Sequence, residues 1–100
     1  MNITKKTEGN TTTFVLSGRL DTITSPQLEK ELKVFFDETP GNLVFDFKDL
    51  EYISSSGLRI VLWSQKEINK LEKTMKVSGV NETVREVFEI TGFTGIVNIE

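Results

Sequence analysis

Two residue types on which much protein chemistry depends are absent from this chain of 100 residues, which has no cysteine and no histidine. Without cysteine there is no disulfide framework and no thiolate chemistry. Without histidine the chain lacks the commonest general base, the commonest transition-metal ligand and any phosphohistidine relay. Whatever the chain does, it must do without these groups.

The chain also lacks an excess of positive charge and any long apolar run. Its 12 basic and 15 acidic residues give a net charge of −3, which provides no electrostatic attraction for nucleic acid or an anionic membrane surface. The longest apolar runs are a few residues, too short for a signal peptide or a membrane-spanning helix. We therefore expect one cytoplasmic domain, residues 1–100, that contacts neither nucleic acid nor membrane directly.

The most informative stretch lies in the middle of the chain and begins with the apolar run Leu43-Val44-Phe45-Asp46-Phe47. Its near-continuous hydrophobicity predicts a central strand that helices cover on both faces. Three serines and Gly57 then precede Leu58, Val61 and Leu62, which have the spacing of a helix's buried face. The serines therefore lie at a helix start, where unpaired N–H groups favour a serine cap and the helix dipole tolerates an added anion.

The rest of the chain alternates between strand and helix patterns. Residues 2–7 and 11–20 predict a hairpin of two strands. A first helix should begin with Ser25 as N-cap and end at Thr39-Pro40-Gly41. The second should run from about Ser56 to Leu71 and bury Leu71.

A short strand over residues 75–80 should follow, and then a third helix with Asn81 as its N-cap and Gly92 as a left-handed C-cap. The apolar residues 93–99 fit either a last strand or a docked tail. The alternation of strands and helices predicts an α/β fold with a mixed sheet and right-handed crossovers.

The segment Asp46-Phe47-Lys48-Asp49-Leu50-Glu51-Tyr52-Ile53-Ser54-Ser55-Ser56-Gly57-Leu58 resembles the signature of STAS domains, the anti-sigma factor antagonists of bacteria. It combines an acidic residue ending a hydrophobic strand, an aromatic-Ile pair, and Ser-Ser-Gly-Leu opening a helix. The order of predicted elements is similar to the family's over essentially the whole chain. The resemblance implies a STAS-like α/β fold, with a mixed central sheet of about four to six strands covered by about three to four helices.

The resemblance also implies a phosphorylation site. In the family the serine immediately before the Gly-Leu pair accepts the phosphate, and this position is Ser56. Ser54 stands where the family often has an aspartate, which leaves Ser55 and Ser54 as alternative acceptors. The position of a serine at a helix start, taken alone, would favour a simple helix cap, which stabilises the helix by about 1 kcal/mol. The surface that we expect to bind a partner comprises Asp21, Ser54, Ser55, Ser56, Gly57, Leu58 and Arg59.

A family member of this kind is a switch protein and not an enzyme. The resemblance implies that the unphosphorylated chain binds an anti-sigma factor, which is a serine kinase of the histidine-kinase-like ATPase fold. Phosphorylation would release the chain and so regulate sigma-factor-dependent transcription, and a PP2C-type phosphatase would reset it. We expect a free monomer without cofactor or metal. The alternative is a STAS subunit of a membrane transport or signalling complex that is never phosphorylated.

Several residues at this surface allow two interpretations. Asp21 and Asp46 suggest an enzyme that holds Mg²⁺, but no Gly-rich phosphate loop completes a catalytic set. The resemblance implies that they shape the surface around Ser56, with Asp46 in a structural role. Gly57 fits either close approach of a partner or the turn into the helix. Arg59 fits an acidic partner or plain solvation, and Trp63 fits the edge of the core or an interface.

Overall fold

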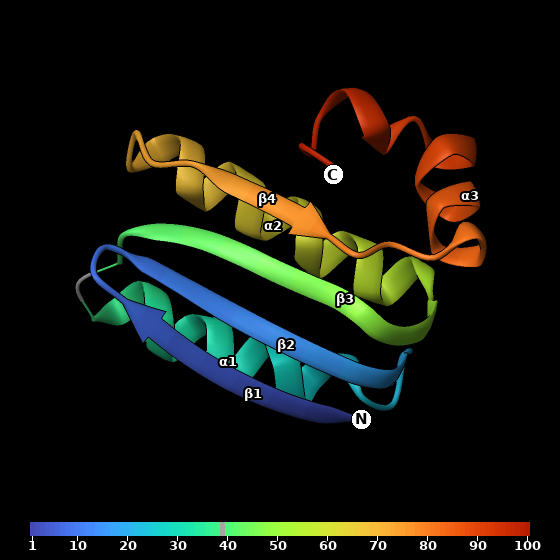
Figure 1. Cartoon of the computed structure of the whole chain (residues 1–100), viewed down its shortest axis with the longest axis horizontal. Coiled ribbons are helices and arrows are strands. Elements are labelled where there is room, and N and C mark those ends of the chain that lie inside the picture. The colour runs from blue at the N-terminus through green and yellow to red at the C-terminus, as the bar shows by residue number, and fades with distance from the viewer. Residues whose placement is uncertain (39) are drawn as a thin grey trace.

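The computed structural model describes residues 1–38 and 40–100, which form one sheet and three α-helices (Figure 1). The strands are β1 (Asn2–Glu8), β2 (Thr11–Leu20), β3 (Asn42–Ile53) and β4 (Met75–Ser78). The helices are α1 (Ser25–Asp37), α2 (Ser55–Lys70), α3 (Glu82–Thr91) and a short 3-10 helix, η1 (Phe93–Gly95). The predicted α/β fold is confirmed.

The sheet is mixed, and its strand order is β1-β2-β3-β4. β1 runs antiparallel to β2, whereas β2, β3 and β4 are parallel to one another. Each crossover moves one strand further along the sheet, so the usual right-handed connection places α1 and α2 on the same face. Figure 1 shows both helices behind the strands. None of the helices in the described residues has the length and apolar character needed to cross a membrane.

The expectation that helices cover both faces of the central strand is wrong. Burial along β3 alternates, with Leu43, Phe45 and Phe47 buried while Val44 is half-buried and Lys48 is exposed. This is the pattern of a strand that packs on a core from one face only. Because both crossover helices lie on one face of the sheet, the other face of β3 carries only occasional apolar residues. A run of five residues is too short to show whether one face of a strand or both are covered.

Aromatic side chains form the centre of the core between the sheet and α1. Phe14 of β2 meets Phe35 of α1 edge to face, with ring centroids 5.9 Å apart, and lies 6.2 Å from the ring of Phe45. Such pairs add about 0.5–1.5 kcal/mol beyond the burial of their area. They fix α1 against the sheet and thereby fix the loop that leads into it.

The capping residues in the sequence predicted most helix ends to within one residue of their position in the structure. Thr24, not Ser25, is the N-cap of α1, and Ser25 begins the helix. Asn81 caps α3 as expected, since its Oδ1 accepts a hydrogen bond of 2.8 Å from the Val84 N–H, and Gly92 ends α3 with φ 77°. Pro40 and Gly41 follow α1 as expected, while Thr39 of the same predicted stop lies outside the described residues.

Two details in the last third of the chain differ from the sequence interpretation or complete it. Leu71 is 41% exposed, because α2 ends at Lys70 and Leu71 is already its C-cap, so the expected burial is wrong. The tail docks instead of forming a full strand. Val97 is buried, and Ile99 makes an isolated parallel bridge to Val77 of β4.

Candidate functional site

The candidate site lies where the parallel strands β2 and β3 end side by side. Leu20 pairs with Ile53 at the last position of both strands, and the Ser54 N–H donates to the Leu20 carbonyl at 2.9 Å. The carboxyl ends of neighbouring parallel strands meet at one edge of a sheet, so the loops that follow them are neighbours. The loop after β2, residues 21–24, is therefore held against the start of α2.

The three serines of this edge have different environments. Ser54 is the N-cap of α2, and its Oγ accepts a hydrogen bond of 3.3 Å from the Gly57 N–H. Ser55 is exposed. Ser56 is half-buried, and its Oγ lies 3.4 Å from Oγ1 of Thr22 in the neighbouring loop. Ser56 is thus the serine that faces the loop after β2.

Asp21 organises that loop through its carboxylate. Its Oδ1 accepts hydrogen bonds of 3.0 Å from the N–H groups of both Ile23 and Thr24, and one of 3.2 Å from the Thr24 hydroxyl. These bonds favour the ionised form, so they lower the pKa of Asp21 below its usual 3.8, with the Thr24 N–H as the main cause. The ionised carboxylate therefore stabilises the loop conformation.

This pKa shift predicts a pH-dependent effect of Asp21→Asn. A carboxyl group whose pKa is lowered by folding stabilises the folded state above its unfolded pKa, and that contribution is lost as the pH falls through the folded value. We expect the variant to have a lower thermal midpoint than wild type near pH 7, and the difference to shrink below pH 3.8. Replacing the exposed Asp49 by Asn is the control, and an equal pH profile for both variants would contradict the prediction.

Arg19 covers the outer side of this edge. Its guanidinium carbon lies 4.3 Å from the centre of the Tyr52 ring, and its Nε lies 3.9 Å from the Asp21 carboxylate. An exposed ion pair of this length contributes little by itself. The contact between Arg19 and the Tyr52 ring connects the ends of β2 and β3. The Asp21 carboxylate is held by the hydrogen bonds of its own loop.

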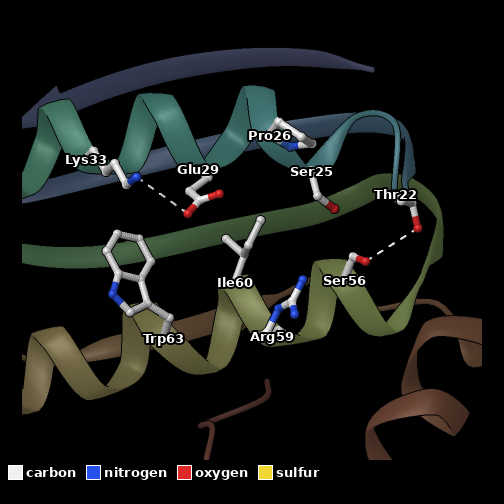
Figure 2. A pocket seen from close by; sticks show the side chains of 9 residues that line it. All are labelled: Thr22, Ser25, Pro26, Glu29, Lys33, Ser56, Arg59, Ile60 and Trp63. Carbon is white, nitrogen blue, oxygen red and sulfur yellow. Dashed lines mark hydrogen bonds and ion pairs between the residues drawn. The ribbon is translucent and has the colours of Figure 1, made fainter.

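A groove of about 400 Å³ runs from Ser56 between α1 and α2 (Figure 2). Thr22 and Ser56 lie at one end and Trp63 lies toward the other. Glu29 and Lys33 of α1 pair with each other at 3.6 Å, whereas Arg59 of α2 makes no ion pair within the described part of the chain. The lining residues are Thr22, Ser25, Pro26, Glu29, Lys33, Ser56, Arg59, Ile60 and Trp63.

The family model for the STAS domain matches residues 2–100 of this chain. The chain belongs to the STAS family. Among curated relatives, the chain is 38% identical over 81 residues to BtrV of Bordetella bronchiseptica, whose name describes a candidate anti-sigma factor antagonist; the match covers 81% of this chain and 70% of BtrV. It is 25% identical to the anti-sigma-B factor antagonist of Staphylococcus aureus, over 99% of this chain and 92% of that protein.

Solved structures support the fold of this STAS domain. The unphosphorylated form of the anti-sigma factor antagonist SpoIIAA superposes with a TM-score of 0.86 at 20% identity, covering 99% of this chain and 88% of SpoIIAA. The phosphorylated form of the Bacillus protein superposes with a TM-score of 0.79 at 19% identity, covering 99% and 91% of the two chains. At these identities the likeness concerns the fold.

Two residues that we expected to contact a partner lie in the core of the STAS domain. Leu58 is 2% exposed. Gly57 is buried, and a Cβ built there would lie 2.7 Å from Cγ of Leu20 and 2.9 Å from Cγ1 of Ile53. The absent side chain of Gly57 therefore lets α2 approach the ends of β2 and β3, not a partner. Ser55 and Arg59 are exposed.

Asp46 does not lie near Ser56 in the STAS domain, which corrects the expectation that it shapes that surface. It lies in the middle of β3, opposite Val15, on the face that alternates with the buried phenylalanines. Its Oδ1 accepts a hydrogen bond of 3.0 Å from the Lys48 N–H, a local backbone contact. Asp21 and Asp46 thus form no pair.

The sequence interpretation missed Thr22, Ile23 and most of the groove. Thr22 and Ile23 lie in a short loop without periodicity, and only its neighbouring Asp21 gave a signal. The groove needs two helices from separate crossovers, so no single segment encodes it. Trp63 lies at the edge of the core, since its half-buried ring lies 5.3 Å from the Phe36 ring, and it also lines the groove.

Proposed function

We propose that this STAS domain is an anti-sigma factor antagonist whose partner binding is switched by phosphorylation of Ser56. The observation that carries the proposal is the position of the Ser56 hydroxyl, which lies in the first turn of α2 at the mouth of an open groove. Two relatives with antagonist names and a superposable protein known in phosphorylated and unphosphorylated forms support it.

The start of α2 suits a phosphate without loss of the fold. The first N–H groups of an α-helix have no partner within the helix, and the dipole favours negative charge there. Ser54 already caps the helix through its own hydroxyl, so modification of Ser56 leaves this cap in place. Phosphorylation adds a charge of about −1.5 to −2 and three acceptor oxygens. Its effect should therefore appear at the surface and not in the core.

The partner in this proposal is an anti-sigma factor that is also a serine kinase of the histidine-kinase-like ATPase fold. The Ser56 oxygen attacks the γ-phosphorus of ATP bound to the kinase, the bond between that phosphorus and the β,γ-bridging oxygen breaks, and ADP leaves. The hydroxyl proton passes to a base of the kinase. A PP2C-type phosphatase hydrolyses the phosphoserine and resets the switch. The domain acts in the cytoplasm as a monomeric substrate and ligand, not as an enzyme.

Ser56 is preferred over its neighbours for different reasons. The Ser54 hydroxyl serves the helix cap, so its modification would disturb the start of α2. Ser55 is more exposed than Ser56 but does not line the groove. Only a phosphate on Ser56 would lie between Thr22 and Arg59, at the end of the groove (Figure 2).

Phosphotransfer with purified proteins tests this proposal. The serine kinases of the ATPase fold encoded by the same organism are each incubated with ATP and the domain, and intact mass and fragmentation locate the phosphate. We expect one kinase to add one phosphate at Ser56, to modify Ser55→Ala equally well, and to leave Ser56→Ala unmodified. Modification of Ser56→Ala would move the switch to another serine. Absence of phosphate with every kinase would favour a constitutive binding subunit.

A further inference from the structure

Ile23 is the most exposed large apolar residue in the described part of the chain, with 87% of its surface accessible. A single exposed isoleucine is ordinary on a protein surface. Ile90 of α3, with 85% exposure, is such a residue and lies far along the chain from the serines. What distinguishes Ile23 is the backbone that carries it and the surface beside it.

The backbone of Ile23 is held in one conformation. Its N–H donates to the Asp21 carboxylate at 3.0 Å, and the next residue, Thr24, donates to the same oxygen. The Thr24 hydroxyl oxygen also accepts a hydrogen bond of 2.9 Å from the Asp21 N–H. An exposed side chain on a fixed loop loses less conformational freedom on binding than one on a mobile loop. The loop therefore presents an apolar group already placed for contact.

The surface beside Ile23 is the proposed switch. Thr22, the preceding residue, has its hydroxyl 3.4 Å from that of Ser56. From there the groove continues along Pro26 and Ile60, and the guanidinium of Arg59, which makes no ion pair with the residues that the structure describes, lies at the same end (Figure 2). Ile23 thus directly follows the residue whose hydroxyl faces Ser56, and Arg59 lies about one turn along α2 from Ser56, so an exposed apolar residue, the proposed phosphate acceptor and a cation belong to the same edge of the domain. A protein partner bound over Ser56 would cover Ile23 as well.

We propose that Ile23 is the apolar anchor of the partner interface, an inference that rests on the proposed function. The partner is a protein that presents an apolar pocket to Ile23 and an acidic group to Arg59. Anchors of this kind dominate interfaces when they are fully desolvated. The same acidic group would repel a phosphate on Ser56, so one arrangement explains both tight binding and release.

Affinity measurements with a matched pair of variants test the anchor. The probe is the purified serine kinase that modifies Ser56 in the phosphotransfer assay, titrated by calorimetry with unphosphorylated domain. We expect Ile23→Ala to raise the Kd about tenfold or more, because the apolar area buried at the anchor is lost. Ile90→Ala removes the same side chain from α3 and should leave the Kd within about twofold. Both variants should melt like wild type, because neither side chain is in the core.

The outcomes separate the anchor from the switch. Wild-type affinity for Ile23→Ala, with normal phosphorylation-dependent release, would overturn the anchor while the proposed function stands. Equal weakening by Ile23→Ala and Ile90→Ala would also overturn it, because the effect would not depend on position. If no such kinase binds the wild-type domain, the proposed function fails and the anchor fails with it.

Discussion

Ser56→Asp should bind the partner kinase about 100-fold more weakly than wild type, while folding unchanged. The added carboxylate lies at the mouth of the groove, where a bound partner would desolvate it and meet it with an acidic group, and like charges in an interface cost several kcal/mol. The carboxylate should not harm the fold, because the start of α2 favours negative charge. Calorimetric titration of the purified kinase measures the loss.

A matched control exists on another helix. Thr83 is an exposed hydroxyl residue at the second position of α3, as Ser56 is the second residue of α2. Thr83→Asp therefore adds the same charge at the same place in a helix but away from the groove, and its Kd should stay near wild type. Ser56→Ala should bind like wild type and resist release by ATP. Equal affinity of Ser56→Asp, Ser56→Ala and wild type would refute the switch.

In the proposed switch, Ser54 and Ser56 would have separate tasks, the helix cap and the phosphate acceptor. A serine that caps a helix offers its oxygen to a backbone N–H, and here Ser54 does so toward Gly57. Modification of that oxygen would break the cap that begins α2. Because Ser56 carries no cap bond, its hydroxyl can gain and lose a phosphate while the helix start persists. The proposed switch would thus act at the surface without unfolding the element that presents it.

The parts of the fold predicted from the sequence are those that neighbouring residues determine. Asn81 caps α3 because its side chain reaches an N–H three residues later, and Gly92 ends α3 because its backbone adopts positive φ. The hairpin and the mixed sheet follow from periodicity and from the length of the crossovers. The serine cluster at a helix start was identified in the same way.

The parts that could not be predicted depend on segments meeting in space. The groove exists because two right-handed crossovers bring α1 and α2 to one face of the sheet. The same topology places neither crossover helix on the other face of β3, which the apolar run at Leu43 did not reveal. Thr22 comes to face Ser56 because the Ser54 N–H donates to the carbonyl of Leu20 and holds the two loops together.

Gly57→Ala should destabilise the domain by about 1–2 kcal/mol, although alanine is normally the better helix residue. The new Cβ would lie 2.7 Å from Cγ of Leu20 and 2.9 Å from Cγ1 of Ile53, both buried, so α2 must move away from the strand ends. Overpacking of this kind costs about 1–3 kcal/mol, which exceeds the gain of about 0.5–1 kcal/mol from replacing a helical glycine. Equilibrium unfolding in urea measures the difference.

Gly95→Ala is the control, because a Cβ at Gly95 meets no atom within 4 Å. Its stability should stay within about 0.5 kcal/mol of wild type. Displacement of α2 by Gly57→Ala would also shift Ser56 relative to Thr22, so partner affinity should fall along with stability. If Gly57→Ala were as stable as wild type and only affinity fell, the glycine would serve the approach of a partner and not the packing of α2 on Leu20.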